Sequence, residues 1–181
     1  MSIKYAILGF LSQAPQTGYD LKKLITVSET LYWSGSNNQI YRSLVQLHED
    51  GLVTKEVEYQ EDNPARKIYT ITEGGREVLH QWLASEPELP DLKQHFLIRL
   101  LWADQLPGAE LHALLDQYEE ELETHLAMAG EQARRGSPLP ATTDRGRLLR
   151  RHIAENWILF YKTQLEWLRT LRRKLYEEES E

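Results

Sequence analysis

One short segment of the chain carries polar side chains of the types that read the edges of nucleic-acid bases. Four of them recur at the i, i+3, i+4 and i+7 spacing of one helix face: Gln39, Arg42, Ser43 and Gln46. In the DNA major groove a glutamine amide can bond an adenine at two points, and an arginine can bond a guanine at two points. An ordinary solvated helix surface has the same composition, so the surrounding elements must decide between the two interpretations.

The segment around this polar stripe has the pattern of an amphipathic helix. Its other face carries three apolar side chains at helical spacing: Ile40, Leu44 and Leu47. Ser36 and Gln39 stand at the S-x-x-Q spacing of a capping box, which predicts that the helix begins at Ser36. Gly51 is expected to end it. Gln39 is therefore a candidate both for capping this helix and for contacting DNA.

Two shorter helices are predicted before this one. Apolar residues at helical spacing indicate the first over residues 3–12, and Pro15 prevents it from continuing. Thr17 and Asp20 have the spacing of a capping box at the start of the second helix. Two cations on that second helix are candidates for contacts with phosphate: Lys22 and Lys23.

A hairpin is predicted after the helix that carries the stripe. Alternating residues indicate strands over 52–59 and 66–71, joined by a polar loop at 60–65. Thr72 is expected to cap a fourth helix, which should bury four apolar side chains: Val78, Leu79, Trp82 and Leu83. Three helices and then a hairpin follow the order of a winged helix-turn-helix. In that fold one helix enters the major groove and the hairpin reaches the adjacent DNA backbone.

The predicted hairpin carries charges of both signs. Its cations are candidates for phosphate contacts: Lys55, Arg66 and Lys67. Its acids would repel phosphate: Glu56, Glu58, Glu61 and Asp62. Because neighbouring strand residues face opposite sides, a DNA-binding hairpin needs its cations on one side and its acids on the other. The alternative is that all of these are ordinary solvated strand charges.

Two stretches of this region resemble a known family. SNNQIYRSLVQLHEDGLV and the later RKIYTITEGG are similar to the DNA-binding region of the PadR family of bacterial transcriptional regulators, and TGYDL resembles that family's Gly-Tyr element. The resemblance implies that four residues of the third helix lie at the DNA: Asn38, Gln39, Tyr41 and Arg42. For Tyr41 the alternative is packing and hydrogen bonding inside the domain.

The sequence departs from the common PadR pattern at two positions. Many members have glycine where Asn38 stands and proline where Arg42 stands. The version found here resembles the branch of the family that carries a long C-terminal helical domain.

The whole chain is predicted to be mainly α-helical and to form two domains. A winged helix-turn-helix is expected over residues 1–84, a proline-containing linker over 85–90 and a helical domain over 91–181. From Phe96 to Ala103 only Arg99 is polar, so that helix must be covered on most sides.

The last helix, over residues 143–177, is expected to be roughly 50 Å long. Seven of its residues alternate in steps of three and four, as in a coiled coil: Ala154, Trp157, Tyr161, Gln164, Leu168, Leu171 and Leu175. This stripe predicts a homodimer interface, and the alternative is that it packs only inside its own chain. A two-fold dimer would match a palindromic operator.

The family resemblance also implies a response to small aromatic or hydrophobic compounds. Five aromatic residues of the C-terminal part are candidates for the lining of a ligand pocket: Trp102, Trp157, Phe160, Tyr161 and Trp167. The alternative is that these side chains simply fill a core or a dimer seam.

The composition excludes several other functions. The chain has no cysteine, which excludes disulfides, thiolate zinc sites and cysteine nucleophiles. No glycine motif for binding phosphate or a dinucleotide appears. The pairs His152 with Glu155 and Glu121 with His125 have spacings that could share a metal ion on a helix face, but such pairs also arise by chance on charged helices. We therefore expect no enzyme, no cofactor and no metal site.

No apolar run approaches the roughly 20 residues that a membrane span needs, so we expect a soluble, cytoplasmic protein. The formal charge is −7, and a DNA-binding role must therefore rest on local placement of cations. The sequence favours a homodimeric repressor, with repression itself implied by the resemblance alone. The alternative function is that of a winged-helix adaptor that binds proteins and never contacts DNA.

Overall fold

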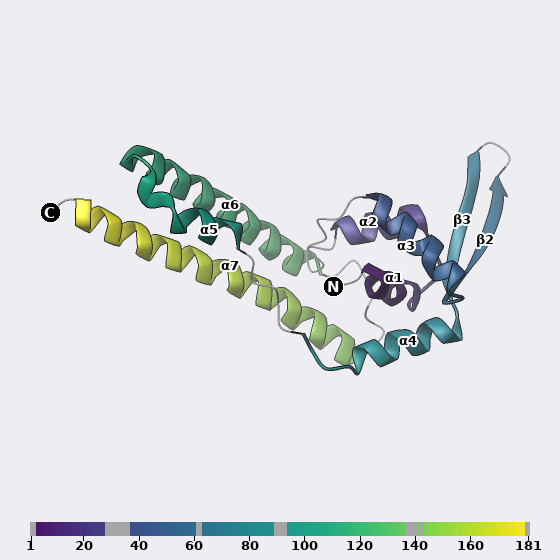
Figure 1. Ribbon diagram of the computed structural model, residues 1–181. Helices are drawn as coiled ribbons and strands as arrows, with labels where there is room; N and C mark the ends of the chain where they lie inside the picture. Colours follow the sequence, from purple (N-terminus) through teal and green to yellow (C-terminus); the bar gives the residue numbers. More distant parts are fainter. Residues whose placement is uncertain are drawn as a thin grey trace. The chain divides into compact units, whose positions relative to one another are not determined.

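The computed structural model describes residues 3–27, 37–60, 63–88, 94–136, 141 and 143–179. The chain divides into two compact units, Met1–Leu89 and Pro90–Glu181. Each unit has its own set of elements (Figure 1), and each is described by itself. The predicted fold class is confirmed, because the described part of the chain is mostly helical with one small antiparallel sheet.

The N-terminal unit is a three-helix core with a hairpin and a fourth helix. Its elements in chain order are α1 (Ile3–Leu11), β1 (Gln16–Thr17), α2 (Gly18–Val27), α3 (Asn37–Glu49), β2 (Val53–Gln60), β3 (Asn63–Ile71) and α4 (Glu73–Leu83). The sheet has the order β1-β3-β2, and both pairings are antiparallel. The most deeply buried side chains come from α1, α2, α3 and the base of β2: Ile7, Leu8, Leu11, Leu21, Leu44, Leu47 and Val53.

The predicted start of α2 and the predicted end of α3 are both found in the structure. The Thr17 hydroxyl donates to Asp20 Oδ2 at 2.7 Å and accepts from the Asp20 amide at 3.1 Å, which caps α2. Gly51 has a φ of +70°, a left-handed conformation that suits glycine and ends α3.

The junction between α3, the hairpin and α4 is held by Thr72. Its hydroxyl accepts from the Gly75 amide at 3.1 Å and donates to the Gly51 carbonyl at 2.9 Å, and its own amide donates to the Leu52 carbonyl at 3.0 Å. Gly75 is buried against the same strand end, where an added Cβ would overlap the carbonyl oxygen of Leu52. The start of α4 is therefore locked onto the turn that follows α3.

Three details of the N-terminal unit differ from the sequence-based expectation. The hairpin loop is shorter than predicted, because Asn63, Pro64 and Ala65 belong to β3 and Gln60 pairs with Asn63. The strand β1 was not predicted, because two residues are too few to show an alternation. Trp82 and Leu83 are 39% and 68% exposed rather than buried.

Trp82 has a partner although it is not a core residue. Its ring stacks on Tyr5 of α1, with 4.5 Å between the ring centroids and 5° between the planes. Burial of one ring face leaves the other face in solvent, which is why the residue counts as exposed while it still fixes α4 against α1.

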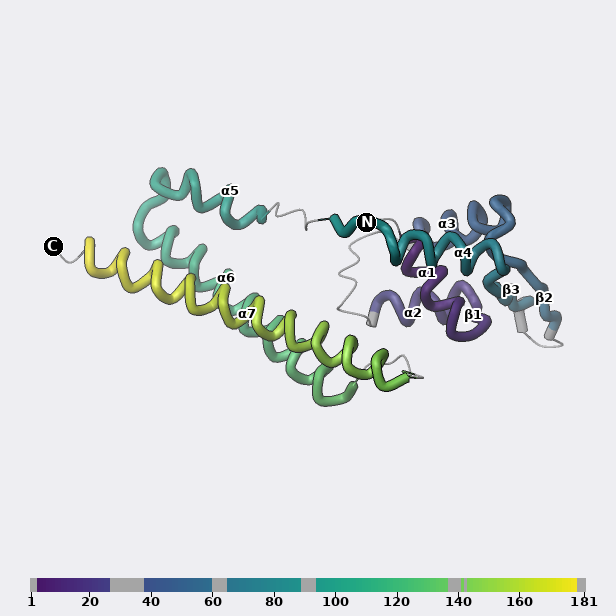
Figure 2. Tube along the Cα trace, turned by 90° about the horizontal axis from the view of Figure 1, so that it is seen from below, coloured from purple at the N-terminus to yellow at the C-terminus, as the bar shows by residue number. Residues whose placement is uncertain are grey.

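The C-terminal unit is built on two long antiparallel helices. Its elements are α5 (His95–Leu101), the 3-10 turn η2 (Ala103–Gln105), α6 (Gly108–Arg135) and α7 (Asp144–Glu179). The two long helices lie side by side in both views (Figures 1 and 2). Their shared core includes Leu115, Leu122, Tyr161, Leu165 and Leu168.

One side of the α6–α7 pair is a ladder of ion pairs. Arg169 contacts Glu119 at 2.7 Å and Glu123 at 2.5 Å, and Arg172 contacts Asp116 at 2.5 Å and also Glu119. Hydrogen bonds from Arg169 and Arg172 outweigh the effect of burial and hold the pKa of Glu119 below its usual range. The ladder joins α6 to α7 along this side of the pair.

The stripe predicted as a dimer seam lies largely in this core. Tyr161 and Leu168 are 5% and 0% exposed, and Trp157, Leu171 and Leu175 pack against the same core. Ala154 and Gln164 are half-buried. Much of the stripe therefore packs against the core of its own unit, as in the alternative interpretation, and its part in a dimer interface stays a prediction.

Among the helices of the described residues, none is long and apolar enough to cross a membrane.

Candidate nucleic-acid interface

The polar stripe of α3 faces outward. Asn38, Gln39, Arg42 and Gln46 are exposed, and Ser43 is half-buried. On the other face Ile40, Leu44 and Leu47 are at most 2% exposed. Since the apolar face is fully occupied by the core, the polar face is presented by a helix that cannot rotate. Such a helix can hold amide and guanidinium groups in fixed positions toward base edges.

Two of the residues predicted to contact DNA from α3 need separate comment. Ser36 lies outside the described residues, so its role as a cap or a contact stays a prediction. Gln46 donates from its amide to Asp50 Oδ1 at 2.9 Å. This bond orients the Gln46 side chain along α3, and a base would have to compete with Asp50 for the amide.

The position of Tyr41 is compatible with both of its predicted roles, contact with DNA and packing inside the domain. Its side chain is 45% exposed, and a Cβ added at Gly18 would come within 2.7 Å of Tyr41 Cε1. The ring therefore packs against the start of α2, and a side chain at position 18 would force the Tyr41 ring to shift. Burial, and to a smaller extent the neighbouring Tyr41, raise the pKa of Tyr69. Tyr41 thus packs in the domain and still presents an edge to solvent.

The cations of α2 differ in exposure. Lys23 is exposed and Lys22 is half-buried. Both remain candidates for phosphate contacts, since a lysine stem can be covered while its ammonium group stays in water.

The register of the hairpin divides its charges between two faces. In an antiparallel pair, residues directly opposite each other point to the same face. Lys55 is opposite Tyr69, and Val57 is opposite Lys67. Lys55, Val57 and Lys67 therefore share one face, which continues the core-facing side formed by Val53, Tyr69 and Ile71 at the base of the hairpin.

The other face of the hairpin carries the acids. Glu58 is opposite Arg66, and Glu56 is opposite Ile68. The expectation that all three cations face DNA together is therefore wrong, because Arg66 follows the alternation to the acidic face. Lys55 and Lys67 lie on the side of the sheet against which the helices pack. Of the hairpin cations, these two stay the candidates for contacts with phosphate.

This division predicts unequal effects for two neighbouring residues. We expect Lys67→Ala to lower the slope of log affinity for DNA against log salt by about one, the value for a single lysine–phosphate ion pair. Arg66→Ala should leave the slope unchanged, since Arg66 stands among acids that already repel phosphate. Titrations of the two variants at several salt concentrations give the slopes. An equal or larger change for Arg66→Ala would contradict the assignment of the faces.

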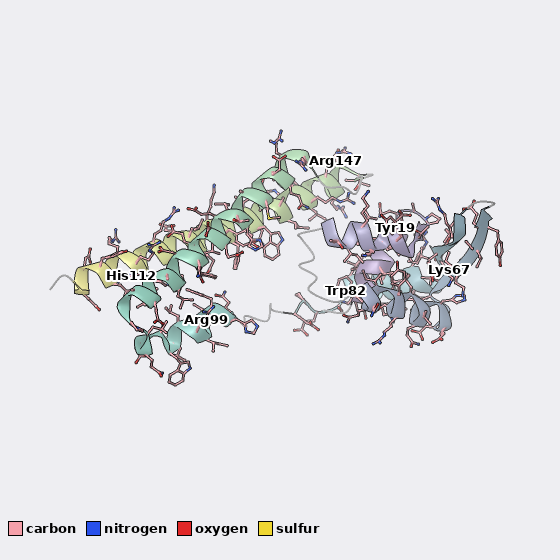
Figure 3. The ribbon with its side chains drawn as sticks, turned by 90° about the horizontal axis from the view of Figure 1, so that it is seen from above. Tyr19, Lys67, Trp82, Arg99, His112 and Arg147 are labelled. Atoms are coloured by element: carbon pink, nitrogen blue, oxygen red, sulfur yellow. The ribbon has the colours of Figure 1, made fainter. Side chains whose placement is uncertain are left out.

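Two exposed tyrosines of this unit were not among the predicted contacts. Tyr19 at the start of α2 is 69% exposed, and Tyr59 near the end of β2 is 85% exposed. Tyr59 lies at the irregularity in the pairing register between Glu58 and Gln60. Figure 3 shows Tyr19 and Lys67 on α2 and on the hairpin. The Gly-Tyr motif was a signal for Tyr19, whereas the exposure of Tyr59 is known only from the structure.

The aromatic residues predicted to line a pocket do not all come together. Phe160 lies edge-on to Tyr161 with 5.4 Å between centroids, and to Trp157 with 6.0 Å. Trp167 is edge-on to Phe96 at 6.5 Å, and Trp102 is 63% exposed. A recess of about 470 Å³ on the α6–α7 pair is lined by other residues: Leu126, Lys162, Leu165, Glu166, Arg169, Thr170 and Arg173. Three of the five aromatic residues therefore form one cluster.

The described residues contain no group of three or more potential ligands that could hold a metal ion. His152 and Glu155 form a single contact of 2.7 Å on the surface of α7. Both side chains are more than half exposed, which is typical of a surface pair.

Comparison with known proteins matches both units. The family model for the "Transcriptional regulator PadR-like family" matches residues 7–81, and that for "Virulence activator alpha C-term" matches residues 92–176. In sequence the chain is 31% identical over 120 residues to the negative transcriptional regulator PadR of Bacillus subtilis. This match covers 65% of the chain and 66% of that relative, and a second curated relative is covered over 47% of its length.

Solved structures match over nearly the whole chain. The structure of Bacillus subtilis PadR in complex with operator DNA has a TM-score of 0.79 and 25% identity, and the match covers 93% of this chain and 95% of that one. The Vibrio cholerae virulence activator AphA has a TM-score of 0.75 and 26% identity, with 98% and 99% covered.

Proposed function

Because the chain belongs to the PadR-like family of transcriptional regulators, we propose that it is a homodimeric repressor that binds a palindromic operator in the cytoplasm. The observation that carries this proposal is the outward polar stripe of α3, set on a helix whose apolar face is buried. Two such helices, related by a two-fold axis, would enter the major groove at two half-sites.

Repression is supported by the relative at 31% identity, which is a negative regulator. A structurally similar protein is an activator, so the same fold occurs in a repressor and in an activator. A repressor acts by occupying its operator, and a reporter gene placed behind that operator should be expressed more strongly when the protein is removed. Lower expression would show activation instead.

The function is tested by titrating the purified chain against the DNA upstream of its own gene, with random DNA as competitor. We expect tight binding that a large excess of random DNA does not abolish. If that region and a genome-wide selection of fragments both yield no specific binding, the proposal is wrong.

Arg42 is expected to read a base. Replacing it with alanine should weaken binding to the operator by about 1–3 kcal/mol if the guanidinium bonds a guanine at two points. Binding to random DNA should fall much less. The same titrations measure both affinities, and Arg147→Ala on α7 serves as a control for loss of a positive charge. Equal losses on operator and random DNA would show that Arg42 contacts phosphate only.

Release by a small aromatic or hydrophobic ligand is the regulatory part of the proposal. It is supported by the cluster of Trp157, Phe160 and Tyr161 in the C-terminal unit. A ligand that inserts there would favour one packing of the helices, and with it one spacing of the two α3 helices. Operator affinity measured across a panel of phenolic acids and hydrophobic cations tests this, and an unchanged affinity across the panel would contradict it.

A further inference from the structure

Helix α3 carries an aliphatic side chain on the face that it turns outward. Val45 is 53% exposed, whereas the three aliphatic residues of the opposite face are almost fully buried. A lone exposed aliphatic residue is common on protein surfaces, so exposure alone says little. Val45 differs by its place: it follows Asn38 at i+7 and Arg42 at i+3, and both of those residues are exposed. These spacings put Val45 on the same helix face as the two polar residues.

The other side chains in this turn of α3 are less available to DNA than Val45. The turn is formed by residues 43–46. Ser43 is half-buried, and one of the four residues lies in the core. Gln46 is exposed, but its amide donates to Asp50 Oδ1 at 2.9 Å. The exposed side chain that has no polar partner to give up is therefore that of Val45.

An aliphatic side chain can take part in reading DNA through thymine. In the major groove the edge of thymine presents an acceptor oxygen and the 5-methyl group, which is an apolar surface. A valine that contacts this methyl group removes apolar surface of both partners from water, which favours binding. Cytosine has a hydrogen atom at the same ring position, so the contact distinguishes thymine from cytosine.

We propose that Val45 reads one thymine in each half-site of the operator through its 5-methyl group. This rests on the DNA binding of the proposed function and adds a residue that selects the sequence. Three residues of an α-helix advance about 4.5 Å, and successive base pairs of DNA are about 3.4 Å apart. The thymine should therefore lie within two base pairs of the base that Arg42 contacts.

Deoxyuridine tests the contact because it pairs as thymidine does and lacks only the 5-methyl group. Each thymine of the operator recovered in the binding selection is replaced in turn, and the full chain is titrated against each duplex by fluorescence anisotropy. We expect one position in each half-site at which the replacement weakens binding about fourfold, the value for burial of one methyl group. Replacement at both positions together should weaken binding about 15-fold, since the two contacts are separate.

Two variants show whether the methyl group is read by Val45. Val45→Ser keeps a similar helix propensity, and it should bind the natural duplex and the doubly replaced duplex with equal affinity. Val57→Ser is the matched control, because Val57 is 41% exposed and lies on the hairpin instead of α3. In this control the 15-fold difference between the two duplexes should persist. Circular dichroism checks that both variants stay folded.

The outcomes separate this inference from the proposed function. If the natural chain binds its operator specifically but tolerates deoxyuridine at every position, Val45 reads no thymine and the inference is wrong. A difference between the duplexes that persists in Val45→Ser would also overturn it, because the methyl group would then act through another residue or through the shape of the DNA. Failure of the natural chain to bind any fragment specifically would overturn the proposed function as well.

Discussion

Affinity for the operator is expected to fall by about 10³–10⁵ when the salt concentration rises from 50 to 200 mM. Each contact between a cation and a phosphate releases a condensed counterion, and the release becomes less favourable as salt rises. Two copies of the N-terminal unit would supply about 6–10 such contacts, the number associated with a fall of this size. The candidate cations are Lys22, Lys23, Arg42, Lys55 and Lys67.

The chain as a whole carries a charge of −7. This salt response would therefore come from the local placement of the cations and not from the net charge. Binding isotherms at four salt concentrations give the slope, and unfolding measured at the same concentrations shows whether the fold itself responds. Lys55→Ala with Lys67→Ala should reduce the slope, since both lie on the helix side of the hairpin. A fall of less than about tenfold would mean that phosphate contributes little, contrary to the expected chemistry of a DNA-binding dimer.

Gly75→Ala is expected to destabilise the N-terminal unit by about 3 kcal/mol, near the upper end of overpacking costs. An added Cβ would overlap the carbonyl oxygen of Leu52 and come within 2.8 Å of Ile71 Cγ1. The Leu52 carbonyl is backbone and accepts from the Thr72 amide, so it cannot move aside without breaking that bond. The change should therefore loosen the connection of α4 to the hairpin.

Gly74→Ala is the matched control for this prediction. Its added Cβ would meet only Thr72 Oγ1, at an ordinary distance of 3.8 Å. Alanine is the better helix former, so this variant should be as stable as the natural chain or more stable by up to about 1 kcal/mol. Hydrogen exchange of peptides from the N-terminal unit in mild urea measures both, with peptides from the C-terminal unit as an internal reference. Equal protection in the two variants would show that the structure adjusts to a side chain at position 75 at little cost in stability.

Local signals in the sequence were sufficient for much of the fold. Capping by Thr17 and Thr72, the end of α3 at Gly51 and the amphipathic character of α3 depend on residues within one turn of each other. Such interactions can be read from spacing because the partner is always three or four positions away. The polar stripe of α3 is exposed for the same reason.

The features that the sequence did not determine depend on pairing between distant segments. The separation of Arg66 from Lys67 follows from which residue of β2 lies opposite each of them, and a shift of one residue would reverse it. The stripe that includes Tyr161 and Leu168 has the same spacing whether its partner is α6 or a second chain. The exposure of Trp82 depends on a ring 77 positions earlier, that of Tyr5.

The acidic residues of the hairpin have a use that does not involve DNA. Strand β2 is at the edge of the sheet, since the order is β1-β3-β2, and one row of its backbone groups is left without a strand partner. Such an edge invites pairing with another chain and so promotes aggregation. Three of the four residues from 55 to 58 are charged, namely Lys55, Glu56 and Glu58, so a strand that paired with this edge would have to bury a charge or lie beside one. The hairpin can therefore extend past the core of its unit without becoming a template for β-sheet growth.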